Sequence, residues 1–239
     1  MELTDDRVDT AEAGGRLAAA APPHLDHAAL ARAQAETEAT PGRRYGPAAR
    51  ALFAVLDAVD GPRRTLSKCK VAELVARVPS QSWEQVAYIA ITHVHGRTGL
   101  ARRIHDRVVE ARSHQDNESW HLLTLEELLA REGPAEGWLR VTLVPQALAL
   151  VYDQASFLAL VVHPAWSYRL DADVEDQARH GYGALVAEPP AWEHEAFEPA
   201  VAADHGGVDS LADLVRQISH DERVHRDASL ARLEEARFR

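Results

Sequence analysis

Two short motifs in this sequence each place a carboxylate and an imidazole at helical spacing. Residues 116–130, DNESWHLLTLEELLA, contain Glu118 and His121, and the later motif DERVH contains Glu222 and His225 at the same separation. Residues three apart share one face of a helix, so both side chains of a pair can reach one point. Burying such groups unpaired would cost on the order of several kcal/mol. Each pair therefore predicts either a hydrated helix face or a ligand bound in the core.

Glu-x-x-His pairs on two helices are half of a known ligand set. Carboxylate-bridged di-iron bundles combine two such pairs with a single Glu from each of two further helices. The anionic oxygens offset the charge of two irons and can bridge them, and one neutral imidazole per iron leaves positions open for oxygen. The alternative is a solvated helix face, because a chain with this Glu and His content contains about one such motif by chance. The other histidines, such as His93 and His95 beside the HGRTG turn, are interpreted as surface or packing residues.

Two further glutamates are candidates for the single ligands. Glu175 lies in VEDQARHGY, and Tyr182 follows it by seven residues, two turns along the same helix face. Glu73 lies in KVAELVARVP, an otherwise apolar stretch. These residues would supply the one carboxylate from each additional helix that a di-iron bundle requires.

The elements that must position these residues are helices, because apolar residues recur along the chain at helical period. No stretch alternates at period two over a useful length, so we predict an all-α fold of the ferritin-like four-helix bundle type, with one or two additional short helices. The expected helical segments are 46–59, 66–95, 99–131, 138–162, 168–187 and 209–235, the last with Asp209 as its N-cap.

Composition limits the domain organisation and the partners. Residues 1–42 are rich in Ala, Gly, Pro and acidic residues without a sustained period, and we predict a disordered N-terminal tail before one bundle domain over residues 43–239. The net charge of −11 argues against nucleic acid as a partner. The single cysteine, Cys69, excludes an internal disulfide and fits a reducing compartment. The acidic N-terminus lacks the pattern of a signal peptide.

The most apolar segment, residues 138–166, is interrupted by Arg140, Pro145 and Asp153. It is therefore a poor transmembrane span. We interpret it as a core helix or as a helix lying in a membrane interface.

Four motifs taken together, ELVARVP, NESWHLLTLEEL, VEDQARHGY and DERVH, resemble those of the alternative oxidases and occur in the same order. The resemblance covers about residues 45–230 and is nearer to the plastid terminal oxidase branch than to the mitochondrial one. It implies a membrane-associated quinol oxidase with two Fe ions per chain, which couples quinol oxidation to the reduction of O2 to water. A soluble di-iron hydroxylase and a non-catalytic helical iron-binding protein are the alternatives.

The resemblance also implies roles for individual residues. The family's tyrosine near the irons corresponds to Tyr182, a one-electron, one-proton donor in the implied mechanism, and Asn117 and Asp221 correspond to residues that orient the ligands. An arginine near the family's quinol pocket corresponds to Lys68, which we assign to substrate binding, although lysine and arginine differ in hydrogen-bond geometry. The six metal ligands correspond to Glu73, Glu118, His121, Glu175, Glu222 and His225.

Glu84 is a rival for the first ligand, because the segment between the first two ligand helices is longer than is usual in the family. If the chain turns near Arg97, Glu118 lies about 32 Å beyond the turn and Glu73 about 36 Å before it. Glu84 lies only about 20 Å before the turn. The hairpin geometry therefore favours Glu73.

The resemblance further implies that segments 46–59 and 138–162 form an apolar face that dips into one leaflet. The expected location is the cytoplasmic side of a membrane, as a peripheral, monotopic protein. Ordinary core packing in a soluble cytoplasmic protein is the alternative, and the same face could instead pair two subunits in a homodimer.

Overall fold

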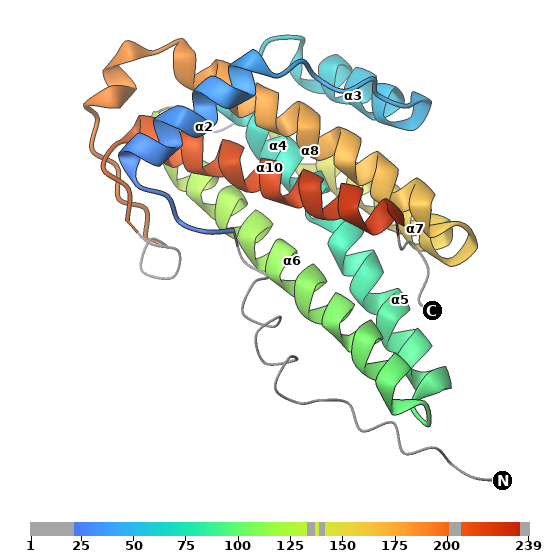
Figure 1. Cartoon of the computed structure of the whole chain (residues 1–239). Helices are drawn as coiled ribbons and strands as arrows, with labels where there is room; N and C mark the ends of the chain where they lie inside the picture. Colours follow the sequence, from blue (N-terminus) through green and yellow to red (C-terminus); the bar gives the residue numbers. More distant parts are fainter. Residues whose placement is uncertain (1–21, 133–136, 139–141, 201–206, 235–239) are drawn as a thin grey trace, which may run out of the picture.

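The computed structural model describes residues 22–132, 137–138, 142–200 and 207–234. Every regular element within these ranges is a helix, which confirms the all-α prediction (Figure 1). The elements are α2 (His27–Ala39), α3 (Pro47–Asp60), α4 (Leu66–Ala76), α5 (Val78–Val94), α6 (Thr98–Glu132), α7 (Val144–Val162), α8 (Pro164–Ala187), the short 3-10 helix η3 (Pro190–Glu193) and α10 (Leu211–Glu234).

The four helices that carry the Glu and Glu-x-x-His motifs form the bundle. α10 packs mainly along α8, and α4 packs along α6. In Figure 1, α10 lies between α6 on one side and α8 on the other. The largest apolar cluster lies among α6, α8, η3 and α10 and includes Trp120, Leu125 and Ile218. The predicted four-helix bundle is confirmed.

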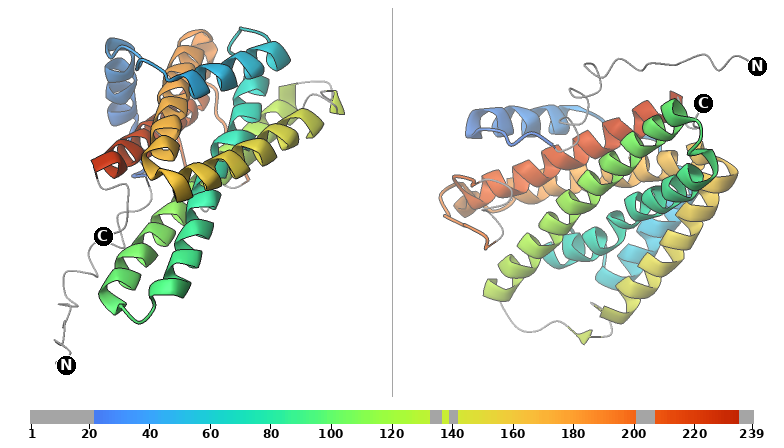
Figure 2. Two further views of the ribbon diagram at one scale, coloured as in Figure 1. Left: turned by 90° about the vertical axis from the view of Figure 1, so that its right-hand side faces the viewer. Right: turned by 90° about the horizontal axis from the view of Figure 1, so that it is seen from below.

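The segment expected as one helix over residues 66–95 is divided into α4 and α5 at Arg77. Pro79 explains the break, because a proline lacks the N–H of a helical hydrogen bond and its ring crowds the carbonyl four residues earlier. α5 and α6 then continue as an antiparallel hairpin that extends beyond the other helices (Figure 2). Ala87, Ile104 and Val108 form the buried core of this hairpin.

The structure differs from the expected N-terminal tail over residues 27–39, which form α2. Asp26 caps this helix, its side chain accepting a hydrogen bond of 2.8 Å from the backbone N–H of Ala29. Leu30, Ala33 and Thr37 are buried, and the helix packs on α10 and α8. Few large apolar residues mark its inner face, so its period is weak in the sequence. The remainder of the expected tail before residue 22 lies outside the described residues.

α10 is the most completely enclosed helix of the bundle, with every residue from Leu211 to Glu222 buried. The expected N-cap, Asp209, is replaced in that position by Ser210. The hydroxyl of Ser210 accepts a hydrogen bond of 3.2 Å from the backbone N–H of Asp213. A helix that is buried on all sides must find partners for each of its polar side chains.

We expect α2 to contribute to the stability of the bundle. Leu30 is 1% exposed, so Leu30→Ala should lower the free energy of unfolding by about 2–5 kcal/mol through the cavity that it leaves. Denaturant titration measures this change. Leu123→Ala is the matched control, because Leu123 is 54% exposed and its truncation should cost less than about 0.5 kcal/mol. Equal effects of the two substitutions would contradict the docking of α2.

Candidate metal centre

The six residues assigned as ligands from the sequence lie together in the middle of the bundle. α4 supplies Glu73, α8 supplies Glu175, and α6 and α10 each supply one Glu-x-x-His pair. They form two overlapping groups, and within each group the potential ligand atoms all lie within 4.8 Å of one another. One group contains Glu73, Glu118, His121 and Glu222, and the other contains Glu118, Glu175, Glu222 and His225.

The distances show that Glu118 and Glu222 lie between the two histidines. Nδ1 of His121 is 3.1 Å from Oε1 of Glu222 and 3.8 Å from Oε2 of Glu118. Nδ1 of His225 is 2.7 Å from Oε1 of Glu118 and 3.9 Å from Oε2 of Glu222. Each histidine therefore turns Nδ1 toward the same two carboxylates, which would contribute to both metal positions.

The carboxylates are buried, and their charges oppose one another. Burial, followed by the charges of Glu118 and Glu222, raises the pKa of Glu73 well above its usual value. Burial and then Glu222 do the same to the pKa of Glu175. Burial also disfavours the Glu118 carboxylate, but hydrogen bonds with His121 and His225 lower its pKa well below the usual value. Full ionisation of this cluster therefore requires cations.

The unpaired atoms of the cluster fit two metal ions. Among the described residues, the inward-facing atoms have no hydrogen-bond partner outside the cluster itself, although such groups are normally paired when buried. Two divalent cations would offset the four carboxylate charges. Each cation would find four donor atoms, one from each residue of its group. The atoms concerned are Oε2 of Glu73, both carboxylate oxygens of Glu118 and of Glu222, Oε2 of Glu175, and Nδ1 of His121 and of His225.

The outer nitrogen of His121 is held by a carboxylate. Nε2 of His121 lies 3.2 Å from Oδ2 of Asp221, the same oxygen that accepts a hydrogen bond of 3.1 Å from Asn117. The other oxygen of Asp221 accepts a hydrogen bond of 2.7 Å from Gln217. An acceptor at Nε2 leaves the lone pair of Nδ1 available for a metal ion. Asn117 and Asp221 thus lie behind His121, and Gln217, which the sequence did not indicate, holds the other oxygen of Asp221.

Tyr182 contacts the cluster directly. Its hydroxyl donates a short hydrogen bond to Oε1 of Glu73, while Oε2 of Glu73 faces the other potential ligands. Burial, followed by the charge of Glu73, raises the pKa of Tyr182 well above its usual value, so the phenol is protonated at neutral pH.

Glu84, the rival for the first ligand, lies away from the cluster. Its carboxylate pairs with Arg112 at 2.8 Å and accepts a hydrogen bond of 3.0 Å from Gln115. It belongs to the α5–α6 hairpin, beyond the break that follows α4. The contacts of Glu84 therefore assign it to the hairpin surface.

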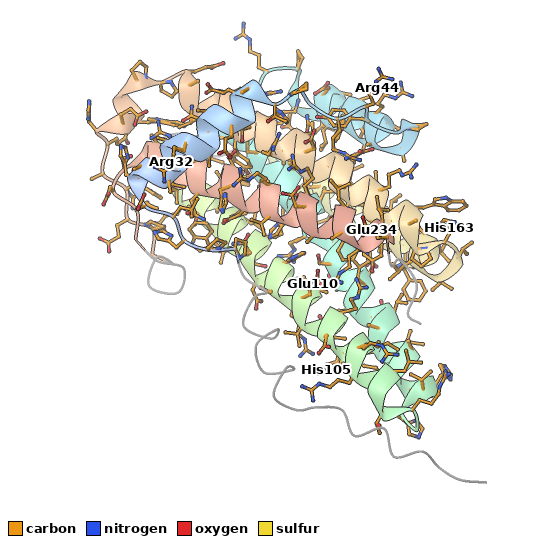
Figure 3. The ribbon with its side chains drawn as sticks, viewed as in Figure 1. Arg32, Arg44, His105, Glu110, His163 and Glu234 are labelled. Carbon is orange, nitrogen blue, oxygen red and sulfur yellow. The ribbon has the colours of Figure 1, made fainter. Side chains whose placement is uncertain are left out.

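The remaining histidines are distributed in two ways. His105 and His163 are exposed, on α6 and at the start of α8 (Figure 3), as are His93 and His95. His220 is instead buried on α10. His114 is also buried, and its ring packs against the tilted ring of His225 at a centroid separation of 4.5 Å. Its position four residues before Glu118 is one turn along α6, and this spacing could have identified it from the sequence.

Comparison with known proteins identifies a matching family. A family model described as alternative oxidase matches residues 50–231. The mitochondrial alternative oxidase of Neurospora crassa is 31% identical over 120 residues, which are 46% of this chain and 32% of that protein. The mitochondrial alternative oxidase of Gelasinospora sp. is 32% identical over 120 residues, with the same coverage. The match thus spans about a third of the length of these curated relatives.

We expect two metal ions per chain, and Glu222→Gln should remove most of both, because Glu222 contributes to both groups. Metal analysis of the purified, iron-loaded protein measures the content. Glu84→Gln is the matched control and should retain both ions, since Glu84 pairs with Arg112 outside the cluster. Full iron content in Glu222→Gln, or a single zinc in the unaltered protein, would refute this assignment.

Proposed function

The chain belongs to the alternative oxidase family, and on that premise we propose that it is a membrane-associated di-iron quinol oxidase that reduces O2 to water. Within the proposal, Glu73, Glu118, His121, Glu175, Glu222 and His225 bind the two irons. The placement nearer to the plastid terminal oxidase branch is also part of the proposal and rests on the four sequence motifs, while the two curated relatives reported above are mitochondrial.

A cavity of about 240 Å³ lies beside the cluster, among α3, α4 and α8. This is slightly smaller than typical ligand pockets of roughly 300–1,000 Å³, and it would hold a substituted ring better than a long chain. Both apolar and polar side chains line it, and they suit a quinol ring with two oxygens. Its lining includes Phe53, Leu56, Lys68, Cys69, Ala178 and Tyr182.

The observation that carries the proposal is the position of Tyr182. This tyrosine lines the cavity, and its hydroxyl donates a hydrogen bond to Glu73 of the metal cluster. A ring bound in the cavity would therefore be separated from the irons by one tyrosine and one carboxylate. Such a connection suits a substrate that is oxidised beside the metal centre rather than on it.

Lys68 is placed to hold a quinol oxygen. Its ammonium group pairs with Asp57 of α3 and donates a hydrogen bond of 2.8 Å to the carbonyl of Gly61. A lysine has three donor hydrogens, so one can face the cavity. Lys68 of α4 thus links its helix to α3 beside the cavity. It can also contact the substrate, in the role that the family assigns to an arginine.

The chemistry requires coupled movement of electrons and protons. When bound, the iron pair supplies the redox chemistry, in which two quinols become two quinones and one O2 becomes two waters. Tyr182 holds its proton against Glu73, so the two side chains form a path for a proton from the cavity to the cluster. The apolar cluster around Trp120, Leu125 and Ile218 lies along the N-terminal half of α10 and limits the access of water to the centre from that side.

An apolar surface on α7 supports a membrane location. α7 is, by length and composition, the described helix that could cross a bilayer, and only 22% of its most apolar window is buried. Its exposed stripe includes Leu150, Val151 and Leu158. Asp153, which interrupts this helix in the sequence, turns inward and accepts a hydrogen bond of 2.6 Å from Ser82. Arg140 lies outside the described residues.

α3 and α7 share the apolar cluster that contains Val75 and Tyr152, since Leu52 of α3 and Leu148 of α7 both pack against it. α3 also lines the cavity. We propose that this side of the protein lies in one leaflet on the cytoplasmic side, so that quinol enters the cavity from the lipid. The same surface could also contribute to a homodimer.

Oxygen consumption by the iron-loaded protein tests the activity. We expect turnover with a short-chain ubiquinol or plastoquinol, at a ratio of two quinols per O2, and the preferred quinol would bear on the plastid-type assignment. Substitution Tyr182→Phe keeps the ring and removes the hydroxyl that contacts Glu73. It should retain both irons and lose turnover by about tenfold or more, an added barrier of about 1.4 kcal/mol.

Metal analysis and thermal melting of Tyr182→Phe are the controls for this experiment. Undiminished turnover in the iron-loaded variant would limit Tyr182 to packing. Absence of quinol-dependent oxygen consumption by the unaltered, iron-loaded protein would refute the oxidase proposal itself.

Membrane binding is tested by sedimentation with phospholipid vesicles. Leu158→Glu, on the exposed α7 stripe, should weaken vesicle binding by about tenfold or more, because it removes an apolar side chain whose burial in the bilayer would be worth about 1.5–3 kcal/mol. Leu123→Glu is the matched control, since Leu123 is similarly exposed but lies on α6. Equal vesicle binding by both variants would place the membrane surface elsewhere.

A further inference from the structure

The two metal positions of the proposed centre have different surroundings. Both would use Glu118 and Glu222. The first, here called the Glu73 position, adds Glu73 and His121, and the second, the Glu175 position, adds Glu175 and His225. The donor types are identical, so any difference between the positions must come from the contacts that hold these donors from outside.

The donors of the Glu73 position are held by hydrogen bonds on their outer sides. Tyr182 donates to the outer oxygen of Glu73. Asp221 lies 3.2 Å from the outer nitrogen of His121, and Asn117 and Gln217 hold the carboxylate of Asp221 in turn. A carboxylate on the outer nitrogen fixes the tautomer and orientation of an imidazole and makes it a stronger donor to a metal.

The histidine of the Glu175 position lacks such a carboxylate. His225 is 1% exposed, and its outer nitrogen Nε2 has no hydrogen-bond partner among the described residues. Its ring instead packs against the tilted ring of His114, at a centroid separation of 4.5 Å and an interplanar angle of 35°. Asp171, a buried carboxylate on α8, accepts a hydrogen bond of 2.6 Å from Ser229, one turn beyond His225, through its Oδ2.

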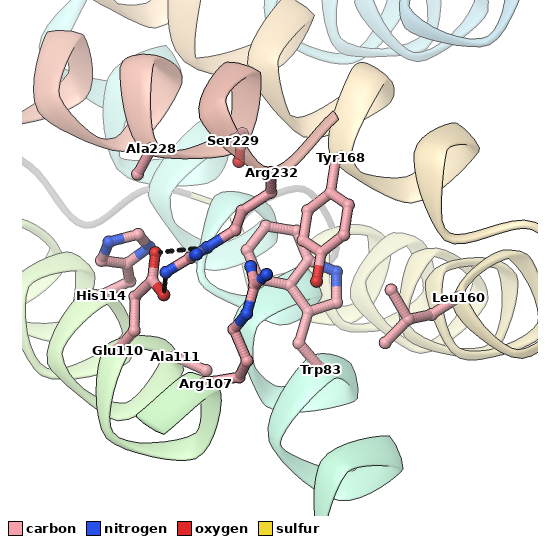
Figure 4. Close-up of a pocket in the computed structure, with 10 residues that line it drawn as sticks. All are labelled: Trp83, Arg107, Glu110, Ala111, His114, Leu160, Tyr168, Ala228, Ser229 and Arg232. Carbon is pink, nitrogen blue, oxygen red and sulfur yellow. Dashed lines mark hydrogen bonds and ion pairs between the residues drawn. The ribbon is translucent and has the colours of Figure 1, made fainter. Parts of the chain in front are cut away.

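In the part of the chain that the structure describes, no carboxylate is hydrogen-bonded to the outer nitrogen of His225. Figure 4 shows His114 beside Glu110 and Arg232, and the carboxylate of Glu110 is engaged by Arg232 in an ion pair. A cavity of about 20 Å³, lined by His114 and Ser229, has room for about one water molecule. A neutral water or a neutral ring cannot polarise an imidazole as strongly as a carboxylate does.

We propose that the two metal positions are unequal, with the Glu73 position filling first and the Glu175 position holding the weaker, exchangeable ion. Asp221 is the positioning residue that creates the difference, and it acts through His121. The inference rests on the proposed function only in that both positions hold metal. It adds an order of loading and identifies which iron the protein would lose first.

Calorimetric titration of the full-length, metal-free protein with Co2+ in the absence of oxygen tests this order. Two binding steps are expected. The matched variants are Glu73→Gln and Glu175→Gln, because each glutamate belongs to one position only. Glu175→Gln should keep one ion at the affinity of the first step, whereas Glu73→Gln should weaken that first step by about tenfold or more. Both substitutions remove a carboxylate whose pKa burial has raised, so the metal-free variants should fold.

Asp221→Asn provides the second measurement. It should weaken the first step by about 10–100-fold and leave the second step unchanged. A general loss of structure would instead weaken both steps and lower the melting temperature of the metal-free protein. Equal effects of Glu73→Gln and Glu175→Gln, or equal weakening of both steps by Asp221→Asn, would overturn the proposed order. Failure of the unaltered protein to bind two Co2+ ions would refute the metal centre itself.

Discussion

Mutual repulsion among four buried carboxylates is the constraint on which this structure depends. Glu73, Glu118, Glu175 and Glu222 are each at most 2% exposed and come from four different helices. Their charges cannot be offset by the two histidines alone, and solvent is excluded from them. The bundle therefore either keeps protons on some of these groups or binds cations between them. The metal chemistry of the family is one consequence of this arrangement, and the network of buried polar contacts around it is another.

The break between α4 and α5 matters for the same reason. α4 contacts α6, α7 and α8, and it brings Glu73 to the cluster while its neighbours Lys68 and Cys69 line the cavity. Beyond Pro79, α5 lies chiefly against α6 and α7, whereas α4 also packs against α8. The helix that supplies Glu73 and the helix that forms the hairpin are therefore separate elements.

The polar contacts around the metal cluster differ between the centre of α10 and its C-terminal end. α10 is enclosed on all sides near the centre, and its polar residues Gln217 and Asp221 find partners within the core. Toward the end of α10, Ser229 and Arg232 pair with Asp171 and Glu110 instead. One histidine of the centre consequently has a carboxylate behind it, and the other has an aromatic ring. The bundle looks symmetric in its ligand types and is asymmetric in the side chains that support them.

Local spacing determined much of this protein. A Glu-x-x-His pair shares a helix face wherever it occurs, and the apolar period identifies the helices, so the ligand types, the all-α class and the position of Tyr182 relative to Glu175 could be predicted from the sequence. The docking of α2 was missed, because its few apolar residues give no period. The packing of the His114 ring against His225 and the shape of the cavity depend on how separate helices cross. Only the tertiary structure decides these features, because sequence periodicity describes one helix at a time and carries no information about the register between two.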